Sequence, residues 1–356
     1  KSISNRTATT FHTAENAKRS SSLDCRFCTM LPAKVQHKFV EKIMTTNLST
    51  GKKKKSIHII TALLLFCNVS LAQDTSVKAS MPVGIEELNG FTQKIYYSTG
   101  YNERARDIAV FMEQAGKYFQ HEIGFTPKTN MYILGPKNWK DFAAKPLLDV
   151  YGFPHNLDQV RLVIGAEDND FWRSFLPPVD QLPPPIATQI KKAYGKTDGS
   201  YSMMPFFDLL ALHEMGHSYT AQAGLKMQRN WMSELFVNIM LHTYVAEKQP
   251  ELLPALEAFP NMVVGGGTAD YKFTSLEDFE KLYATLGMGP KNYGWYQCKL
   301  HSAAKDIYNA GGKKVLKKLW KALKKHQEKM TDEEFVSMLK KVHPAVADIY
   351  LKWNKN

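Results

Sequence analysis

The sequence predicts an α+β fold in which a small mixed α/β lobe is followed by a mainly helical lobe. Two observations favour it. Short runs of β-forming residues alternate with a helical pattern up to about residue 170, and from residue 206 onwards the apolar residues follow helical spacing. With 356 residues and 44% hydrophobic content, the chain is long enough to bury a sizeable core.

The first lobe is predicted from strand and helix patterns. Residues 102–124 carry apolar side chains at helical spacing and predict a helix that Gly124 closes. The predicted strands cover residues 93–98, 130–134 and 161–164. Proline clusters at 177–178 and 183–185, followed by residues 195–201, predict a hinge-like surface passage without regular structure.

The second lobe is predicted to consist of helices separated by glycine or proline. These helices cover residues 206–223, 233–247, 276–286, 296–310, 313–329 and 332–342. The helix at 313–329 combines an apolar stripe with many lysines. We expect the stripe to pack into the lobe while the lysines are solvated, and binding to an anionic membrane surface is the alternative.

The N-terminal segment predicts secretion. Lys52–Lys55 precede an apolar stretch at 59–67, and Ser70 and Ala72 supply small residues two apart, the pattern of a signal peptide. We therefore expect a signal peptide at 44–72 that is cleaved after Ala72, and a secreted or periplasmic protein. The apolar stretch is too short for a transmembrane anchor.

The predicted organisation follows from that signal peptide. Residues 1–43 are interpreted as an upstream extension or read-through, because Met44 is a plausible start. Residues 73–90 form a linker, and the two lobes cover 91–205 and 206–356.

Net charge excludes one class of partner. The chain has 46 basic and 34 acidic residues, but residues 1–72 hold 12 of the basic and 3 of the acidic ones. The remainder is close to +3, so we expect no nucleic-acid partner. Cys298 is the one cysteine after Ala72, so no intramolecular disulfide is expected in the mature chain.

Residues 213–217 read His-Glu-Met-Gly-His within a predicted helix. Residues four apart lie on one helix face, so His213 and His217 can offer two imidazole nitrogens to one metal ion. Glu214 is rotated by about 100° from His213, which places its carboxylate beside the ion rather than among its ligands. The pattern predicts zinc with Glu214 as general base, and ordinary buried histidines are the alternative.

A catalytic zinc ion takes three protein ligands, so the chain must supply a third. A third histidine in the pattern HExxHxxGxxH is excluded, because the chain has Thr220 and Ala223 at the two decisive positions. Glu234 lies 17 residues after His217 on the next predicted helix. We therefore predict Glu234 as the third ligand.

The motif and the segment WMSELFVN at residues 231–238 together resemble the gluzincin peptidases of the peptidase MA-like superfamily, which includes aminopeptidase N-like and thermolysin-like enzymes. The resemblance is specific only over residues 212–238. It implies a zincin-like fold with an active-site cleft between the lobes, a zinc cofactor, and hydrolysis of peptide or protein substrates. The chain departs from the family pattern at Leu235, where glycine is usual, and at Asn238, where aspartate is frequent.

The resemblance also implies a tyrosine or histidine on a later helix that donates a hydrogen bond to the oxyanion. Tyr296, Tyr293 and His301 are the candidates. Tyr296 is favoured, because it opens a predicted helix and follows Glu234 by 62 residues, a separation similar to the family's.

Taken together, these features predict a secreted or periplasmic zinc metallopeptidase. Two alternatives stay open. One is a catalytically inactive zincin-fold binding protein, motivated by the departure at Asn238. The other is a structural or surface-interaction protein in which the lysine-rich helix matters and the histidines are packing residues.

Overall fold

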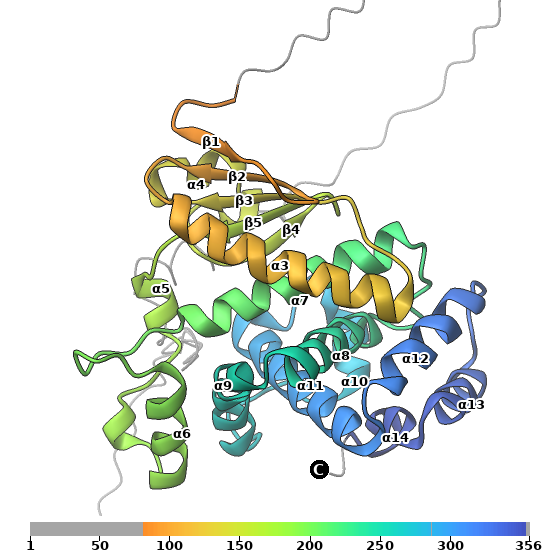
Figure 1. Cartoon of the computed structure of the whole chain (residues 1–356). Coiled ribbons are helices and arrows are strands. Elements are labelled where there is room, and N and C mark those ends of the chain that lie inside the picture. Colours follow the sequence, from red (N-terminus) through yellow and green to blue (C-terminus); the bar gives the residue numbers. More distant parts are fainter. Residues whose placement is uncertain (1–80, 286, 354–356) are drawn as a thin grey trace, which may run out of the picture.

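The computed structural model describes residues 81–285 and 287–353. A five-stranded mixed sheet with helices forms the first part and a mainly helical region follows, which confirms the predicted α+β fold (Figure 1). The predicted extension at 1–43 and the predicted signal peptide at 44–72 lie outside the described residues. Among those described, no helix is both long and apolar enough for a membrane span.

The sheet has the strand order β1-β2-β3-β5-β4. The strands β2, β3 and β5 run parallel, and the edge strands β1 and β4 are antiparallel to their neighbours. The bounds are Ile85–Leu88 for β1, Lys94–Ser98 for β2, Asn130–Leu134 for β3, His155–Leu157 for β4 and Arg161–Gly165 for β5. β1 lies inside the segment 73–90 that was predicted as a linker, and β4 was not predicted.

Helices cover both faces of the sheet because successive strand residues point to opposite sides. Ile95 and Tyr97 of β2 join the large core that includes α3 (Asn102–Ile123), whereas Tyr96 packs against a smaller cluster that contains Trp139 of α4 (Pro136–Phe142). The predicted helix at 102–124 is confirmed, and Gly124 ends it in the left-handed conformation with φ 72°.

The prolines at 183–185 do not break regular structure as predicted. They open α6 (Pro184–Tyr194), where Pro184 and Pro185 occupy the first turn. Proline is tolerated there because the first N–H groups of a helix have no partner within it. Two short segments precede α6: the helix α5 (Asp170–Arg173) and the 3₁₀ turn Val179–Gln181.

The second part is built from packed helices, which Figure 1 shows on the opposite side of α7 from the sheet. The bounds are Met204–Gln222 for α7, Asn230–Lys248 for α8, Leu253–Gly265 for α9, Leu276–Leu282 for α10, Gly289–Gly311 for α11, Lys314–Lys325 for α12, Asp332–Val342 for α13 and Pro344–Lys352 for α14. Short 3₁₀ turns lie at Lys145–Leu147, Pro250–Leu252 and Tyr283–Thr285. The helices α9 and α14 were not predicted.

The helix α7 connects the two parts. It contacts β4 and β5 on one side and α8 and α9 on the other. The turn between β4 and β5 contains Asp158 and Gln159, both in the left-handed region with φ 55° and 66°. This tight turn brings the edge of the sheet onto the helix that carries residues 213–217.

Candidate metal centre

The helix α7 carries the two histidines of the sequence motif on one face. The ring centroids of His213 and His217 are 5.2 Å apart, as expected for residues separated by one helical turn. His213 is buried and His217 is half-buried. Metal-binding atoms of His213, Glu214 and His217 all lie within 4.8 Å of one another.

The helix α8 brings Glu234 to the same point. Oε2 of Glu234 lies 3.2 Å from Nε2 of His213 and 3.6 Å from Nε2 of His217. The close approach of the two helices depends on Gly216, because a Cβ there would lie 2.9 Å from side-chain atoms of Val237 on α8. The glycine within the motif thus lets the glutamate reach the histidines.

These distances fit a zinc ion. Bonds of about 2.0–2.1 Å in tetrahedral geometry place ligand atoms about 3.3 Å apart. The two measured separations, 3.2 and 3.6 Å, lie on either side of that value. Two imidazoles and one carboxylate are also a known donor set for catalytic zinc. The residues present therefore suit this ion.

Asn238 fixes the orientation of His213. Nδ1 of His213 lies 2.8 Å from Oδ1 of Asn238, so the imidazole donates its Nδ1 proton and keeps the Nε2 lone pair free for a metal. Nδ2 of Asn238 is buried without a hydrogen-bond partner. The ring of His301 stacks on His213 at 6.0 Å, and Nε2 of His301 is likewise buried without a partner.

Glu234 is ionised in its buried position. Burial alone would raise the pKa of Glu234, but His217 and His213 hold that pKa well below its usual range. Burial lowers the pKa of His217, yet the carboxylate of Glu234 outweighs this effect and raises it to about 9. A negative charge is therefore fixed where a cation would bind.

Two further side chains hold the Glu234 carboxylate. The hydroxyl of Tyr283 donates to Oε1, and Nε2 of Gln297 donates to Oε2 at 2.8 Å. Neither residue was predicted. Tyr283 lies just after a helix with no pattern to distinguish it, and Gln297 became relevant only because α11 packs on α8.

The carboxylate of Glu214 is held by the edge strand β4. The backbone N–H of Asn156 in β4 donates to Oε2 of Glu214 at 3.1 Å. The Asn156 side chain donates to the backbone carbonyl of Glu214 and to Oγ of Ser218. The carboxylate of Glu214 thus lies beside the histidines, on the side that faces the sheet. No sequence signal marked Asn156, which sits in a strand of three residues.

The tyrosines proposed as oxyanion donors lie in different surroundings. Tyr296 is fully buried and its hydroxyl donates to the carbonyl of Ser275 at 2.7 Å. The hydroxyl oxygen of Tyr293 accepts a hydrogen bond from Gln297 at 2.8 Å. Only the side chain of Gln297 therefore lies between Tyr293 and Glu234. The hydroxyl of Tyr296 is directed away from this site, towards Ser275.

The start of α11 explains this difference. The helix begins at Gly289, two turns before the predicted start at 296. Tyr293 and Gln297 are four residues apart and share the face towards α8, while Tyr296 is rotated away towards Phe279 and Trp353.

Comparison with known proteins found no matching family model, no matching curated protein and no matching solved structure. What the structure shows is an HExxH-like group on a helix, His213, Glu214 and His217, with Glu234 of the next helix nearby.

Proposed function

We propose that this chain is a zinc-dependent metallopeptidase of the gluzincin type. One observation carries the proposal: Oε2 of Glu234 lies at the spacing of zinc ligands from Nε2 of both His213 and His217. Glu214 lies beside the two histidines on the same helix, α7. Two histidines, a glutamate ligand and an adjacent free carboxylate are the groups that metal-assisted peptide hydrolysis requires.

The roles follow from these positions. Zinc, when bound, acidifies a water molecule and polarises the scissile carbonyl. Glu214 takes the proton of the attacking water and passes it to the leaving amine. Its carboxylate is held for this task by the backbone N–H of Asn156. Asn238 keeps Nε2 of His213 directed towards the ion.

Tyr293 is the group that we assign as oxyanion donor. The hydroxyl protons of Tyr296 and Tyr283 are already donated to Ser275 and Glu234. The oxygen of Tyr293 accepts from Gln297, so its own proton is free for a substrate oxygen. Burial and, to a smaller extent, the negative charge of Glu234 raise the pKa of Tyr293 well above its usual range, so the hydroxyl keeps its proton.

We further propose that the protein acts outside the cytoplasm, with a peptide or protein as substrate. The support for the location is the pattern of residues 44–72, with four lysines before an apolar stretch and small residues at 70 and 72. A peptide or protein substrate is supported by the groups in the site, because two histidines, a glutamate ligand and Glu214 suit metal-assisted hydrolysis of a peptide bond.

The test measures zinc content and cleavage of a peptide library for the wild type, Glu214→Gln and His217→Ala. We expect about one zinc per wild-type chain and cleavage of peptides. Glu214→Gln should keep zinc and lose a factor of about 10²–10⁴ in kcat, because it removes the general base. His217→Ala should lose both zinc and cleavage.

The outcomes separate the candidate functions. Wild-type protein that holds zinc but cleaves no peptide would favour the non-catalytic zincin-fold binding protein. Wild-type protein with far less than one zinc per chain would refute the metal site. Cleavage that survives Glu214→Gln would refute the assigned base.

A further inference from the structure

The helix α12 has two sharply different faces. Val315, Leu316, Leu319, Trp320 and Leu323 are buried, which confirms the predicted packing of the apolar stripe. The opposite face carries six exposed lysines, which we call the lysine ridge: Lys314, Lys317, Lys318, Lys321, Lys324 and Lys325. At 3.6 residues per turn they occupy an arc of about 120° and extend over roughly 16 Å.

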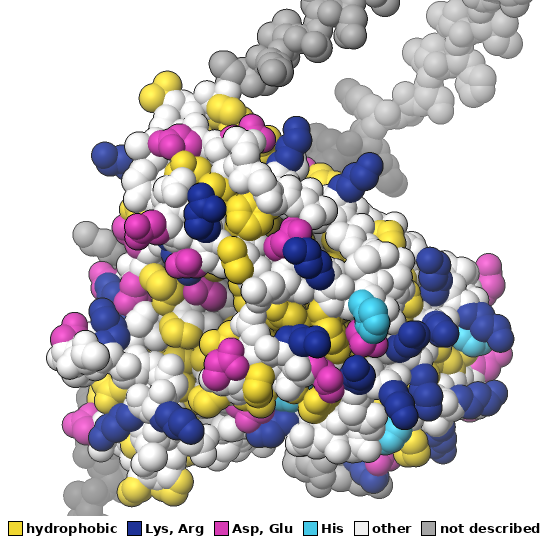
Figure 2. Space-filling view, viewed as in Figure 1, with side chains coloured by type: hydrophobic (Ala, Val, Ile, Leu, Met, Phe, Trp, Pro, Cys, Tyr) yellow, Lys and Arg dark blue, Asp and Glu magenta, His cyan; other side chains and the backbone are white. Residues whose placement is uncertain are grey.

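The lysine ridge is not neutralised by the rest of the described chain. Within the described residues, none of its six ammonium groups has a carboxylate within 4.0 Å or a hydrogen bond. The adjacent Lys313 differs, because it lies 3.4 Å from Glu122 and 3.8 Å from Glu247. Figure 2 shows dark-blue side chains crowded at the end of the molecule that α12 and α13 form.

Like charges at helical spacing repel one another by a few tenths of a kcal/mol per pair. Fold stability alone therefore gives no reason to gather six of them on one face. The apolar stripe of α12 would pack equally well with mixed charges opposite to it.

The shape beside the lysine ridge limits what can bind. A groove of about 560 Å³ lies between α12 and the end of α3, and one of about 990 Å³ lies between α12 and α13. Carboxylates line both: Glu122 in the first, and Glu328, Glu333 and Glu334 in the second. An anionic polymer that followed either groove would meet these negative charges, whereas a flat surface would touch the ridge between them.

We propose that the lysine ridge binds the surface of a membrane rich in anionic lipids. The contact is electrostatic and involves no insertion, because the apolar residues of α12 are already packed inside the protein. Each lysine near such a surface contributes about a fivefold gain in binding. The contact orients the molecule with α12 towards the lipid.

The test is a vesicle-sedimentation assay on the full chain with the lysines at 52–55 replaced by glutamine, so that this basic run does not contribute. The vesicles contain phosphatidylglycerol and phosphatidylcholine, or phosphatidylcholine alone. The ridge variant is Lys317→Gln, Lys321→Gln and Lys324→Gln. We expect the parent chain to bind the anionic vesicles alone, and the ridge variant to bind about a hundredfold more weakly.

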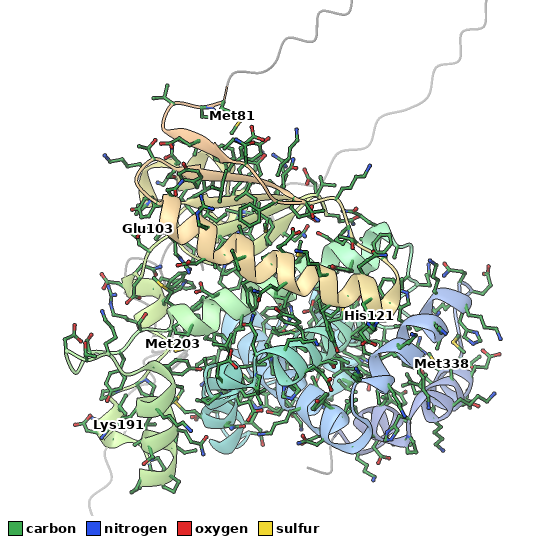
Figure 3. All side chains as sticks on the ribbon, viewed as in Figure 1. Met81, Glu103, His121, Lys191, Met203 and Met338 are labelled. Atoms are coloured by element: carbon green, nitrogen blue, oxygen red, sulfur yellow. The ribbon has the colours of Figure 1, made fainter. Side chains whose placement is uncertain are left out.

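A matched control removes the same charge elsewhere: Lys137→Gln, Lys191→Gln and Lys192→Gln, all at exposed positions. In Figure 3, Lys191 lies at the far side of the molecule from His121 and Met338, which flank α12. This control should bind nearly as well as the parent. Raising the salt from 0.1 to 1 M should abolish binding, because the screening length falls from about 10 to 3 Å.

Four results would overturn the proposal. They are no binding of the parent to anionic vesicles, equal weakening by the control and ridge variants, binding that persists in 1 M salt, and ridge-dependent binding of inorganic polyphosphate without binding of vesicles. Circular dichroism of both variants checks that folding is intact, which we expect because these lysines are exposed.

Discussion

Gly216, between the two histidines, allows a decisive test of how the metal centre is assembled. An alanine Cβ at this position would lie 2.9 Å from both Cβ and Cγ1 of Val237, and 3.5 Å from its Cα. Val237 is fully buried, and a β-branched side chain in a helix has one strongly preferred rotamer. The contact can be relieved only by separating α7 from α8.

The net effect is the difference between two opposing free energies. Overpacking of this kind costs about 1–3 kcal/mol, and the stiff neighbour favours the upper part of that range. Alanine gains about 1 kcal/mol over glycine in helix propensity. We therefore expect Gly216→Ala to destabilise the fold by about 1–2 kcal/mol, and to lower Tm by roughly 2–8 °C. Zinc affinity should fall as well, since α8 carries Glu234.

Thermal and urea unfolding measure the stability, and chelator competition measures the zinc affinity. Gly116→Ala in α3 is the matched control, because its Cβ would meet only the Tyr219 hydroxyl at 4.0 Å. It should be neutral or stabilising. In a Val237→Gly background, which removes both Cβ and Cγ1 at position 237, the packing cost of Gly216→Ala should disappear. If Gly216→Ala is as stable as Gly116→Ala, the close approach of the helices is not what the glycine provides.

Three further predictions concern single residues. Tyr293→Phe should lower kcat by about 10²–10³ at unchanged zinc content, whereas Tyr296→Phe should cost about 1 kcal/mol of stability and keep activity; steady-state kinetics with metal analysis separate these effects. Asn238→Ala should weaken zinc binding about 10–100-fold in chelator competition, and Asn238→Asp should not. Burial, with Lys305 nearby, lowers the pKa of His242 to about 4. The unfolded chain then binds more protons between about pH 6.5 and 4. The free energy of unfolding should therefore fall by up to about 3 kcal/mol as the pH is lowered from 6.5 to 4. His242→Gln should flatten this dependence of stability on pH.

Local sequence patterns predicted much of the fold and of the candidate metal centre. The helix at 102–124 and the strand Asn130–Leu134 were predictable because their signals repeat over several residues. His213 and His217 were predictable because helix geometry alone places them on one face. Glu234 could be proposed from its spacing on the next helix, and the structure brings its carboxylate to both imidazoles.

Features that depend on distant partners could not be predicted. The strand β4 has three residues, and its role comes from pairing with β5 and lying on α7. The helix α6 was missed because prolines in a first turn resemble a break. The sequence favoured Tyr296 over Tyr293, and the choice could not be made correctly from the sequence because only the packing of α11 decides which hydroxyl proton is already donated.

Glu234 and the polar side chains around it, between α7 and α8, are poorly explained as a contribution to the stability of the fold. Glu234 is 1% exposed and accepts hydrogen bonds from Tyr283 and Gln297 beside two imidazoles. Apolar side chains of similar volume often replace a buried ion pair without loss of stability. A fold that needed only packing would have little use for a fixed negative charge there. A divalent cation would compensate that charge and, by displacing the proton of His217, would take Nε2 of both imidazoles as ligands, so metal binding would account for residues that packing leaves unexplained.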